Sequence, residues 1–285
     1  IAPGLAEVKV YAQTHGRNNF YIRLTDKSNT AVKPKVLIAG TVHGNEWIAT
    51  ATVVGVAHQL LKHWNSDAEV KELLKTRDVY IVPVTCPDGY ARESREVEGM
   101  DPNRSYPWPG NPNAQSATCV KNLRDLYEDV KFNATIDYHA SGRMWLLPWG
   151  YKQEDFQEGN KGNLMRQLAK KMADLNGYIW GKIPDMVGYI APGSSADYFY
   201  LRGKELGLGT LAIGAEVGTS FHPPESAIAT EVNKNYKPML LFIKDGPVLF
   251  QGQAYSMAKS RGYDPNKALE LPNFADPRKY FSGLE

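Results

Sequence analysis

Short apolar runs and longer amphipathic segments alternate along the chain. Apolar runs rich in β-branched residues predict strands at Val36–Thr41, Val79–Thr85, Ala134–His139 and Thr210–Val217. Helical spacing of apolar residues predicts helices at Glu46–Trp64, Ala117–Val130, Asn163–Leu175 and Glu231–Ile243. Strands and helices that alternate in this way predict an α/β fold, with a mixed central β-sheet covered by helices on both faces.

Long irregular stretches separate some of these elements. Pro87–Pro112 and Ile183–Ser195 are rich in Pro and Gly, and loops of this length usually either carry function or are disordered. Pro83 places the strand Val79–Thr85 at a sheet edge or near a strand end. Residues 251–285 are polar and weakly periodic. We therefore expect one domain over residues 1–250, followed by a C-terminal extension without an assigned role.

Composition narrows the classes of protein. A length of 285 residues with 42% hydrophobic residues is enough for a single large domain. The 33 basic and 31 acidic residues give a formal charge of +2, and no basic tract suggests a nucleic-acid or anionic-membrane partner. No apolar run reaches the roughly 18 residues that span a bilayer, so we expect a soluble protein. The chain begins Ile-Ala-Pro without an initiator Met, which suggests a processed product.

The chain has two cysteines, Cys86 and Cys119, too few for a disulfide framework. They could form one bridge or remain two buried thiols, and the sequence leaves both open. Neither has a second Cys or His nearby at ligand spacing, so we do not expect these cysteines to bind zinc.

The strongest chemical signal is His43-Gly44-Asn45-Glu46, between a predicted strand and a predicted helix. A His and a Glu three residues apart can bind one metal if the backbone turns sharply between them, and Gly44 permits such a turn. His139 ends another predicted strand, at the sheet edge where open α/β folds place their sites. Imidazole and carboxylate groups both suit Zn²⁺.

An H-x-x-E pattern alone is frequent by chance, and the other histidines illustrate this. His58 and His63 fall on a predicted helix as surface or packing residues, and His15 lies in a polar loop. The order of strand, HGNE, helix and second strand ending in His is what makes a metal site the better interpretation.

VHGNEW and the strand end TIDYHAS resemble the zinc metallocarboxypeptidase family, of the carboxypeptidase A/B type. Further motifs follow in the family's order across residues 36–243. They are CPDGY (with Cys86 where the family usually has Asn), MDPNRSYP, GSSADYFY, GAEVG and FHPPESAIATEVNKNYKPMLLF. The resemblance implies one Zn²⁺ per chain, held by His43, Glu46 and His139, and a metalloprotease domain over residues 1–250.

The resemblance also implies roles for further residues. Glu216 would be the general base, and its place after the apolar TLAIGA suits a raised pKa; by itself it could equally be a solvated strand-end carboxylate. Arg95 would stabilise the oxyanion, with Arg92 as its rival. The substrate carboxylate would be held by Asn103, Arg104 and Tyr200, with Tyr198 as the competing tyrosine. Asp101 would orient His43.

We therefore expect a secreted or periplasmic, monomeric hydrolase that acts on peptides with a free C-terminal carboxylate. The interval Leu201–Ala215 holds Arg202, Lys204 and Glu205, none of which fixes the side-chain preference. The compact loop around Asn103 favours a microbial member. Alternatives are an N-acyl amino acid deacylase of the aspartoacylase-like type, an enzyme that trims cell-wall peptides, an inactive peptide-binding relative and a metal-free binding module.

Overall fold

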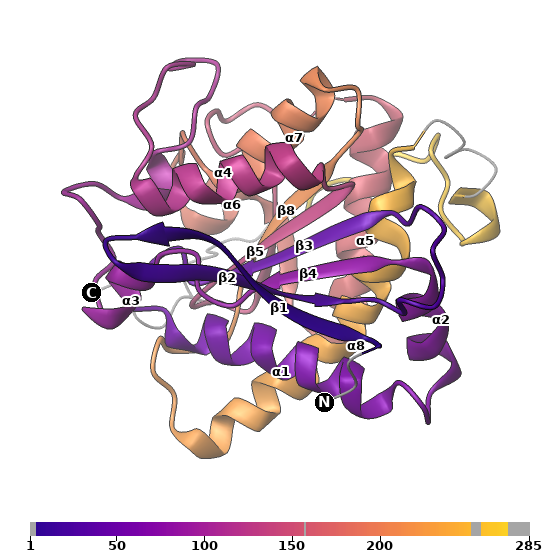
Figure 1. Ribbon diagram of the computed structural model, residues 1–285. Coiled ribbons are helices and arrows are strands. Elements are labelled where there is room, and N and C mark those ends of the chain that lie inside the picture. The colour runs from indigo at the N-terminus through magenta and orange to yellow at the C-terminus, as the bar shows by residue number, and fades with distance from the viewer. Residues whose placement is uncertain (1–3, 157, 252–257, 273–285) are drawn as a thin grey trace.

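A mixed eight-stranded sheet forms the centre of the computed structural model, which describes residues 4–156, 158–251 and 258–272 (Figure 1). Within these residues the strand order is β1-β2-β4-β3-β5-β8-β6-β7. The strands are β1 Ala6–Thr14, β2 Arg17–Leu24, β3 Lys35–Gly40, β4 Asp78–Val82, β5 Ala134–His139, β6 Met144–Leu147, β7 Ile179–Lys182 and β8 Leu211–Glu216.

The middle of the sheet is parallel, and it aligns the ends of three strands. β3 pairs with β5 and β5 with β8, so that Gly40 lies beside Tyr138 and His139 beside Glu216. All six residues of β5 are buried, as expected for a parallel strand with both faces covered. The carboxyl ends of β3, β5 and β8 therefore meet at one edge of the sheet.

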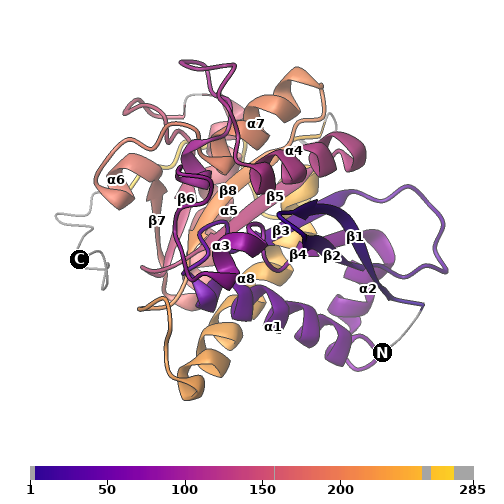
Figure 2. The ribbon, with the colours of Figure 1, turned by 60° about the vertical axis from the view of Figure 1, so that its left-hand side comes forward.

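Helices cover both faces of this sheet, as the sequence predicts (Figures 1 and 2). One face is covered by α1 Trp47–His63 and α8 Glu225–Leu249, with α2 Ala68–Thr76 and α5 Asn160–Asn176 packed against α8. The opposite face is covered by α4 Thr118–Val130 and α7 Ser195–Glu205. Three short helices, α3 Pro87–Ala91, η1 Pro102–Arg104 and α6 Ile183–Val187, lie in the two stretches expected to be irregular.

The predicted elements are all present, with small shifts at their ends, and α8 differs most. It runs from Glu225 to Leu249 and contains Pro238 and Pro247, both buried. Pro83 directly follows β4, which lies between β2 and β3, so this proline marks a strand end and not a sheet edge.

Part of the segment after residue 250 packs on the domain. Tyr263 is buried, and its hydroxyl donates to Asp245 Oδ2 of α8 at 2.8 Å. Gln167 of α5 donates to the carbonyls of Asp264 and Lys267 at 2.7 and 3.0 Å. Residues 252–257 and 273–285 of the predicted extension lie outside the described residues. No described helix has the length and apolar character needed to cross a membrane.

Cys86 and Cys119 form a disulfide, which settles the alternative that the sequence left open. Cys86 precedes α3 and Cys119 lies in the first turn of α4, and both are fully buried. The bridge joins cysteines 33 positions apart, and the loop between them includes Arg95, Asp101 and Arg104. It therefore restrains a loop that contributes several side chains to the site described below.

We expect the double variant Cys86→Ala/Cys119→Ala to fold with a free energy of unfolding lower by roughly 3–4 kcal/mol, because opening this loop gives entropy to the unfolded chain. Urea denaturation measures the difference. Wild-type protein under reducing conditions is the control and should lose a similar amount. A double variant that stays within about 0.5 kcal/mol of the wild type would contradict the prediction.

Candidate active site

The connection from β3 to α1 carries His43 and Glu46 and is tightly packed. Thr41 adopts a positive φ of 53° as the chain leaves β3. Gly44 does not have a positive φ. A side chain at Gly44 would instead overlap the backbone of Gly89 in α3. The backbone turns between His43 and Glu46, as expected, and the Glu46 amide donates to the His43 carbonyl at 3.2 Å. Glycine is needed at position 44 because two backbone segments touch there.

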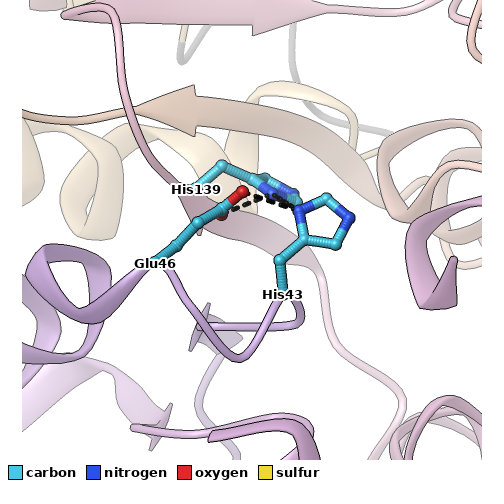
Figure 3. Close-up of side chains that lie close together, drawn as sticks. All are labelled: His43, Glu46 and His139. Carbon is cyan, nitrogen blue, oxygen red and sulfur yellow. Dashed lines mark hydrogen bonds and ion pairs between the residues drawn. The ribbon is translucent and has the colours of Figure 1, made fainter. Parts of the chain in front are cut away.

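His43, Glu46 and His139 point toward one another (Figure 3). His43 Nδ1 lies 2.7 Å from Glu46 Oε1 and 3.3 Å from His139 Nδ1, and His139 Nδ1 lies 3.2 Å from Glu46 Oε2. Atoms that bind one tetrahedral zinc ion at about 2.0–2.2 Å stand roughly 3.3 Å apart. Two of the three separations match this value, and two imidazoles with one carboxylate are a ligand set used by catalytic zinc sites. These residues therefore fit a zinc ion.

Glu46 is suited to remain ionised at the centre of this group. Burial by itself would raise its pKa, but the charges and hydrogen bonds of His43 and His139 outweigh burial and lower the pKa to about 2. Glu46 also occupies the N-cap position of α1, where the helix dipole favours a negative charge.

A carboxylate lies beside the second nitrogen of each histidine. His43 Nε2 lies 2.9 Å from Asp101 Oδ1, which is the contact expected for Asp101. His139 Nε2 lies 3.3 Å from Asp137 Oδ2, and the same oxygen accepts a hydrogen bond from Ser195 Oγ at 2.7 Å. Such carboxylates fix the orientation of metal-binding imidazoles. The sequence analysis missed Asp137, although alternation along β5 places it on the same face as His139.

Glu216 ends β8 and lines a cavity together with His43, Glu46 and His139. Its Oε2 is buried and has no hydrogen-bond partner among the described residues. Burial raises the pKa of Glu216 to about 8, and the charge of Glu46 acts in the same direction. The structure therefore does not support a solvated strand-end carboxylate.

Arg95, and not its rival Arg92, lies in this cavity. Arg95 donates to Asp101 Oδ2 from Nε and Nη2 at 3.2 and 2.8 Å, and its Nη1 lies 3.5 Å from Glu46 Oε1. Arg92 is directed to Asp88, at 2.6 Å. Burial would raise the pKa of Asp101, but the hydrogen bond from His43 and the charges of His43 and Arg95 hold it well below its usual range.

Asn103 and Arg104 also line the cavity. Asn103 Oδ1 accepts a hydrogen bond from the Ser195 amide at 2.9 Å, which ties η1 to the start of α7. Arg104 Nη1 donates to the Asn103 carbonyl at 2.8 Å. Within the described part of the chain, no carboxylate forms an ion pair with Arg104. Its guanidinium is thus held in place by neutral groups and can bind an incoming anion.

The prediction for Tyr200 was wrong. Tyr200 is 1% exposed and packs against Trp149, Phe156 and Phe250, outside the residues that line the cavity. Its rival Tyr198 is also buried, against Tyr106. Both belong to α7, which packs on the sheet and directs these side chains into the core.

A different tyrosine lies at the cavity. Tyr189 is 48% exposed, lines the cavity, and accepts a hydrogen bond from Arg104 Nη2 at 3.3 Å. It follows α6, within the stretch that the sequence marked as an irregular loop. The sequence did contain a signal for Tyr189, because it lies in a predicted loop and Tyr200 lies near the end of a motif that forms a helix. A tyrosine on a loop can face a site, whereas one on a packed helix is directed into the core.

One end of the cavity is apolar. The charged residues Arg202, Lys204 and Glu205, considered above for the side-chain preference, do not line the cavity. Arg202 and Lys204 pair instead with Glu128 and Glu158, and Arg202 also pairs with Glu205. The apolar end is lined by Leu146, Ile183, Val187, Ala191, Ala196 and Gly214.

The comparisons with known proteins agree with this geometry. Residues 2–238 match the family model described as zinc carboxypeptidase. Rat carboxypeptidase A2 is 28% identical over 204 residues, which cover 59% of this chain and 48% of that protein. Metallocarboxypeptidase A of Trichophyton rubrum is 25% identical over 205 residues, which cover 58% and 48%.

Solved structures show the same fold at low sequence identity. The crystal structure of carboxypeptidase A from Helicoverpa armigera has a TM-score of 0.72 at 18% identity and covers 86% of this chain and 69% of its own. A metallo-carboxypeptidase from Burkholderia cenocepacia gives 0.65 at 20% identity, with 85% and 65% covered. The chain spans about half the length of the curated relatives named above. With the family model matching most of its residues, the chain belongs to the zinc carboxypeptidase family, and zinc is its cofactor.

Proposed function

We propose that this protein is a zinc-dependent carboxypeptidase that hydrolyses the C-terminal amide bond of peptides. The observation that carries the proposal is Arg104, a guanidinium without an ion-pair partner among the described residues, in the same cavity as His43, Glu46, His139 and Glu216. A guanidinium binds a carboxylate through two parallel hydrogen bonds. A site that must hold a terminal carboxylate before it cleaves is the site of an exopeptidase.

His43, Glu46 and His139 would hold the zinc ion, which would supply a Lewis acid and lower the pKa of a bound water toward neutrality. Glu216 Oε2, which has no competing hydrogen-bond partner, accepts the proton of the attacking water and passes it to the leaving amine. Arg95 offers Nη1 to the oxyanion that develops on the scissile carbonyl. Asp101 holds Arg95 in place from the other side of the guanidinium.

The substrate carboxylate is held by Arg104, with the amide of Asn103 and the hydroxyl of Tyr189 beside it. We infer that Tyr189 takes the role that the sequence analysis gave to Tyr200. The half-exposed position of Tyr189 on a loop after α6 allows its ring to close over a bound substrate.

The apolar end of the cavity indicates the preferred terminal side chain. The aliphatic side chains of Leu146, Ile183 and Val187 pack together there. The charged residues that line the cavity are those to which zinc binding, catalysis or carboxylate binding is already assigned. We infer a preference for apolar or aromatic C-terminal residues. The relatives named above do not favour the deacylase or cell-wall alternatives.

The protein is proposed to act as a monomer in a secreted or periplasmic location. The disulfide between Cys86 and Cys119 supports the location, because such bridges persist mainly in oxidising compartments.

Peptides with free and amidated C-termini, incubated with the protein and followed by mass spectrometry, test the reaction class. Loss of single residues from free C-termini only, abolished by a chelator and restored by zinc, is the expected result. Cleavage restricted to N-acyl amino acids would replace the proposal by a deacylase activity, and hydrolysis that is insensitive to the chelator would remove zinc from the reaction.

For Glu216→Gln we expect kcat to fall by roughly 10²- to 10⁴-fold, because the amide cannot accept the proton of the attacking water. Zinc content should stay at one ion per chain, as measured by atomic absorption. The exposed Glu225 at the start of α8 provides the control Glu225→Gln, which should hydrolyse peptides like the wild type. A zinc-loaded Glu216→Gln protein with near wild-type kcat would exclude Glu216 as the base.

For Arg104→Ala we expect the preference for free over amidated peptides, expressed as a ratio of kcat/KM, to fall by about 10- to 100-fold. This corresponds to the loss of hydrogen bonds to a charged group worth about 1.5–3 kcal/mol. Arg92→Ala, outside the cavity, is the matched control and should keep the preference. An Arg104→Ala protein with an unchanged preference would show that another group selects the carboxylate.

Gly214→Ala tests the apolar end of the cavity. A Cβ at this position would lie 3.4 Å from the Leu146 side chain, an ordinary contact, so the variant should fold. Because the added methyl narrows the cavity, kcat/KM should fall more for peptides ending in Phe or Trp than for those ending in Ala or Val. Equal effects on all four peptides would place the terminal side chain elsewhere.

A further inference from the structure

Two tight turns, far apart in the sequence, face each other through the side chains of His15 and Glu98. The first turn, His15-Gly16, joins β1 to β2, and both residues have positive φ, 48° and 78°. The second turn, Glu98-Gly99, has φ of 54° and 75° and joins Val97 to Met100. Val97 and Met100 exchange two backbone hydrogen bonds of 3.0 Å, so this segment is a second, minimal hairpin.

Glu98 is not a residue that the backbone would favour at the first position of its turn. Two successive residues with positive φ form a turn of the type that prefers Asn, Asp or Gly at its first position. Glutamate at this position makes the backbone conformation less favourable, because its Cβ lies too close to the following carbonyl oxygen in the left-handed region. The side chain of Glu98 must therefore contribute a contact that a better turn-former would not make.

That contact joins three elements. Glu98 Oε1 lies 2.7 Å from His15 Nε2, and the Thr118 amide donates to Glu98 Oε1 and Oε2 at 3.2 and 3.1 Å. Thr118 is the first residue of α4, so the carboxylate also caps that helix. Burial would raise the pKa of Glu98, but the hydrogen bonds from Thr118 and His15 lower it, and the carboxylate stays ionised.

The hairpin that carries His15 is itself firmly held. Asn122 of α4 donates to the Gln13 carbonyl at 3.0 Å, and Asn19 of β2 donates to the Thr85 carbonyl after β4 at 2.9 Å. Arg17 pairs with Asp88 of α3 at 3.1 Å. His15 therefore projects from a support fixed to the sheet and to two helices.

The second hairpin, Val97–Met100, lies between two residues of the candidate active site. Arg95 lies two residues before Val97, and Asp101 directly follows Met100. The two side chains meet across the hairpin, with Arg95 Nη2 donating to Asp101 Oδ2 at 2.8 Å, and Asp101 Oδ1 lies 2.9 Å from His43 Nε2. A shift of the tip would thus move both residues relative to His43.

We propose that His15 and Glu98 are positioning residues, which clamp the tip of the 97–100 hairpin to β1–β2 and α4 so that Arg95 and Asp101 stay aligned with the site. The consequence for catalysis rests on the function proposed above, in which Arg95 faces the oxyanion. The clamp itself does not depend on that function. Neither residue touches the substrate, because neither lines the cavity.

Glycine variants distinguish the loss of the side-chain contact from damage to the turns themselves. Glu98→Gly and His15→Gly remove the contact, but glycine readily adopts a positive φ, so each turn should form at least as well as in the wild type. We expect kcat to fall by roughly tenfold in either variant and in the double variant, because a displaced arginine stabilises the transition state less well. KM should change less than kcat, since Asn103 is also held from outside the hairpin, by the hydrogen bond from the Ser195 amide to its Oδ1. Glu98→Gln, which keeps an acceptor for Thr118 and His15, should restore most of kcat.

Lys131→Gly is the matched control. Lys131 has a φ of 60° at the end of α4 and does not line the cavity. Its replacement therefore also puts glycine in place of a larger residue at a positive φ, but leaves the contact between His15 and Glu98 intact. Its kcat should equal that of the wild type.

Hydrogen exchange at the amides of Val97 and Met100 tests the clamp without any turnover. Faster exchange in Glu98→Gly and His15→Gly than in the wild type and Lys131→Gly is the expected result. Unchanged exchange together with unchanged kcat would overturn the proposal. If the wild type hydrolyses no peptide, the proposed function fails, and the exchange rates alone decide whether the clamp exists.

Discussion

The parallel register of β3, β5 and β8 is the constraint on which the candidate site depends. It places the residues after Gly40, the side chain of His139 and the side chain of Glu216 at one edge of the sheet. A one-residue slip of β5 would turn His139 to the opposite face and put a neighbouring residue beside Glu216. The buried apolar side chains of these strands therefore fix the metal-binding geometry as well as the core.

Electrostatic balance is the second requirement of this edge. Glu46, Asp101, Asp137 and Glu216 lie near one another, and a group of buried carboxylates is unstable unless cations accompany it. Arg95 supplies part of the compensation, 2.8 Å from Asp101 and 3.5 Å from Glu46. A zinc ion held by His43, Glu46 and His139 would add two further positive charges. The carboxylates of Asp137 and Glu46 raise the pKa of His139 despite its burial.

The sequence was sufficient where a residue's role follows from its place on a regular element. His43, Glu46 and His139 could be located because they stand at or near the end of an apolar strand or the start of a helix, whereas the role expected for Glu216 came from the resemblance of GAEVG to the family's motif. The β1–β2 hairpin escaped prediction because it is an edge element whose Val8 and Val10 are 68% and 48% exposed, so its apolar pattern does not mark a buried face. The disulfide and the Glu98 contact join segments whose proximity depends on tertiary packing, and spacing along the chain carries no information about it.

The error over Tyr200 shows how the two halves of the site differ. The zinc-binding half consists of buried groups whose positions are determined several times over, by strand register, by the Gly44–Gly89 contact and by paired carboxylates. The half that we propose to bind the substrate lies on the irregular segments around η1 and α6, where Tyr189 is exposed and Arg104 is held by neutral partners. Motif order locates the first half reliably, because few positions satisfy its constraints. In the second half, Tyr198 and Tyr200 both satisfy the motif GSSADYFY, but the packing of α7 buries both, and the tyrosine that lines the cavity, Tyr189, lies before that motif. This division suits the chemistry, since bond cleavage needs groups fixed before the substrate arrives, whereas capture of the substrate needs a side that is open to it.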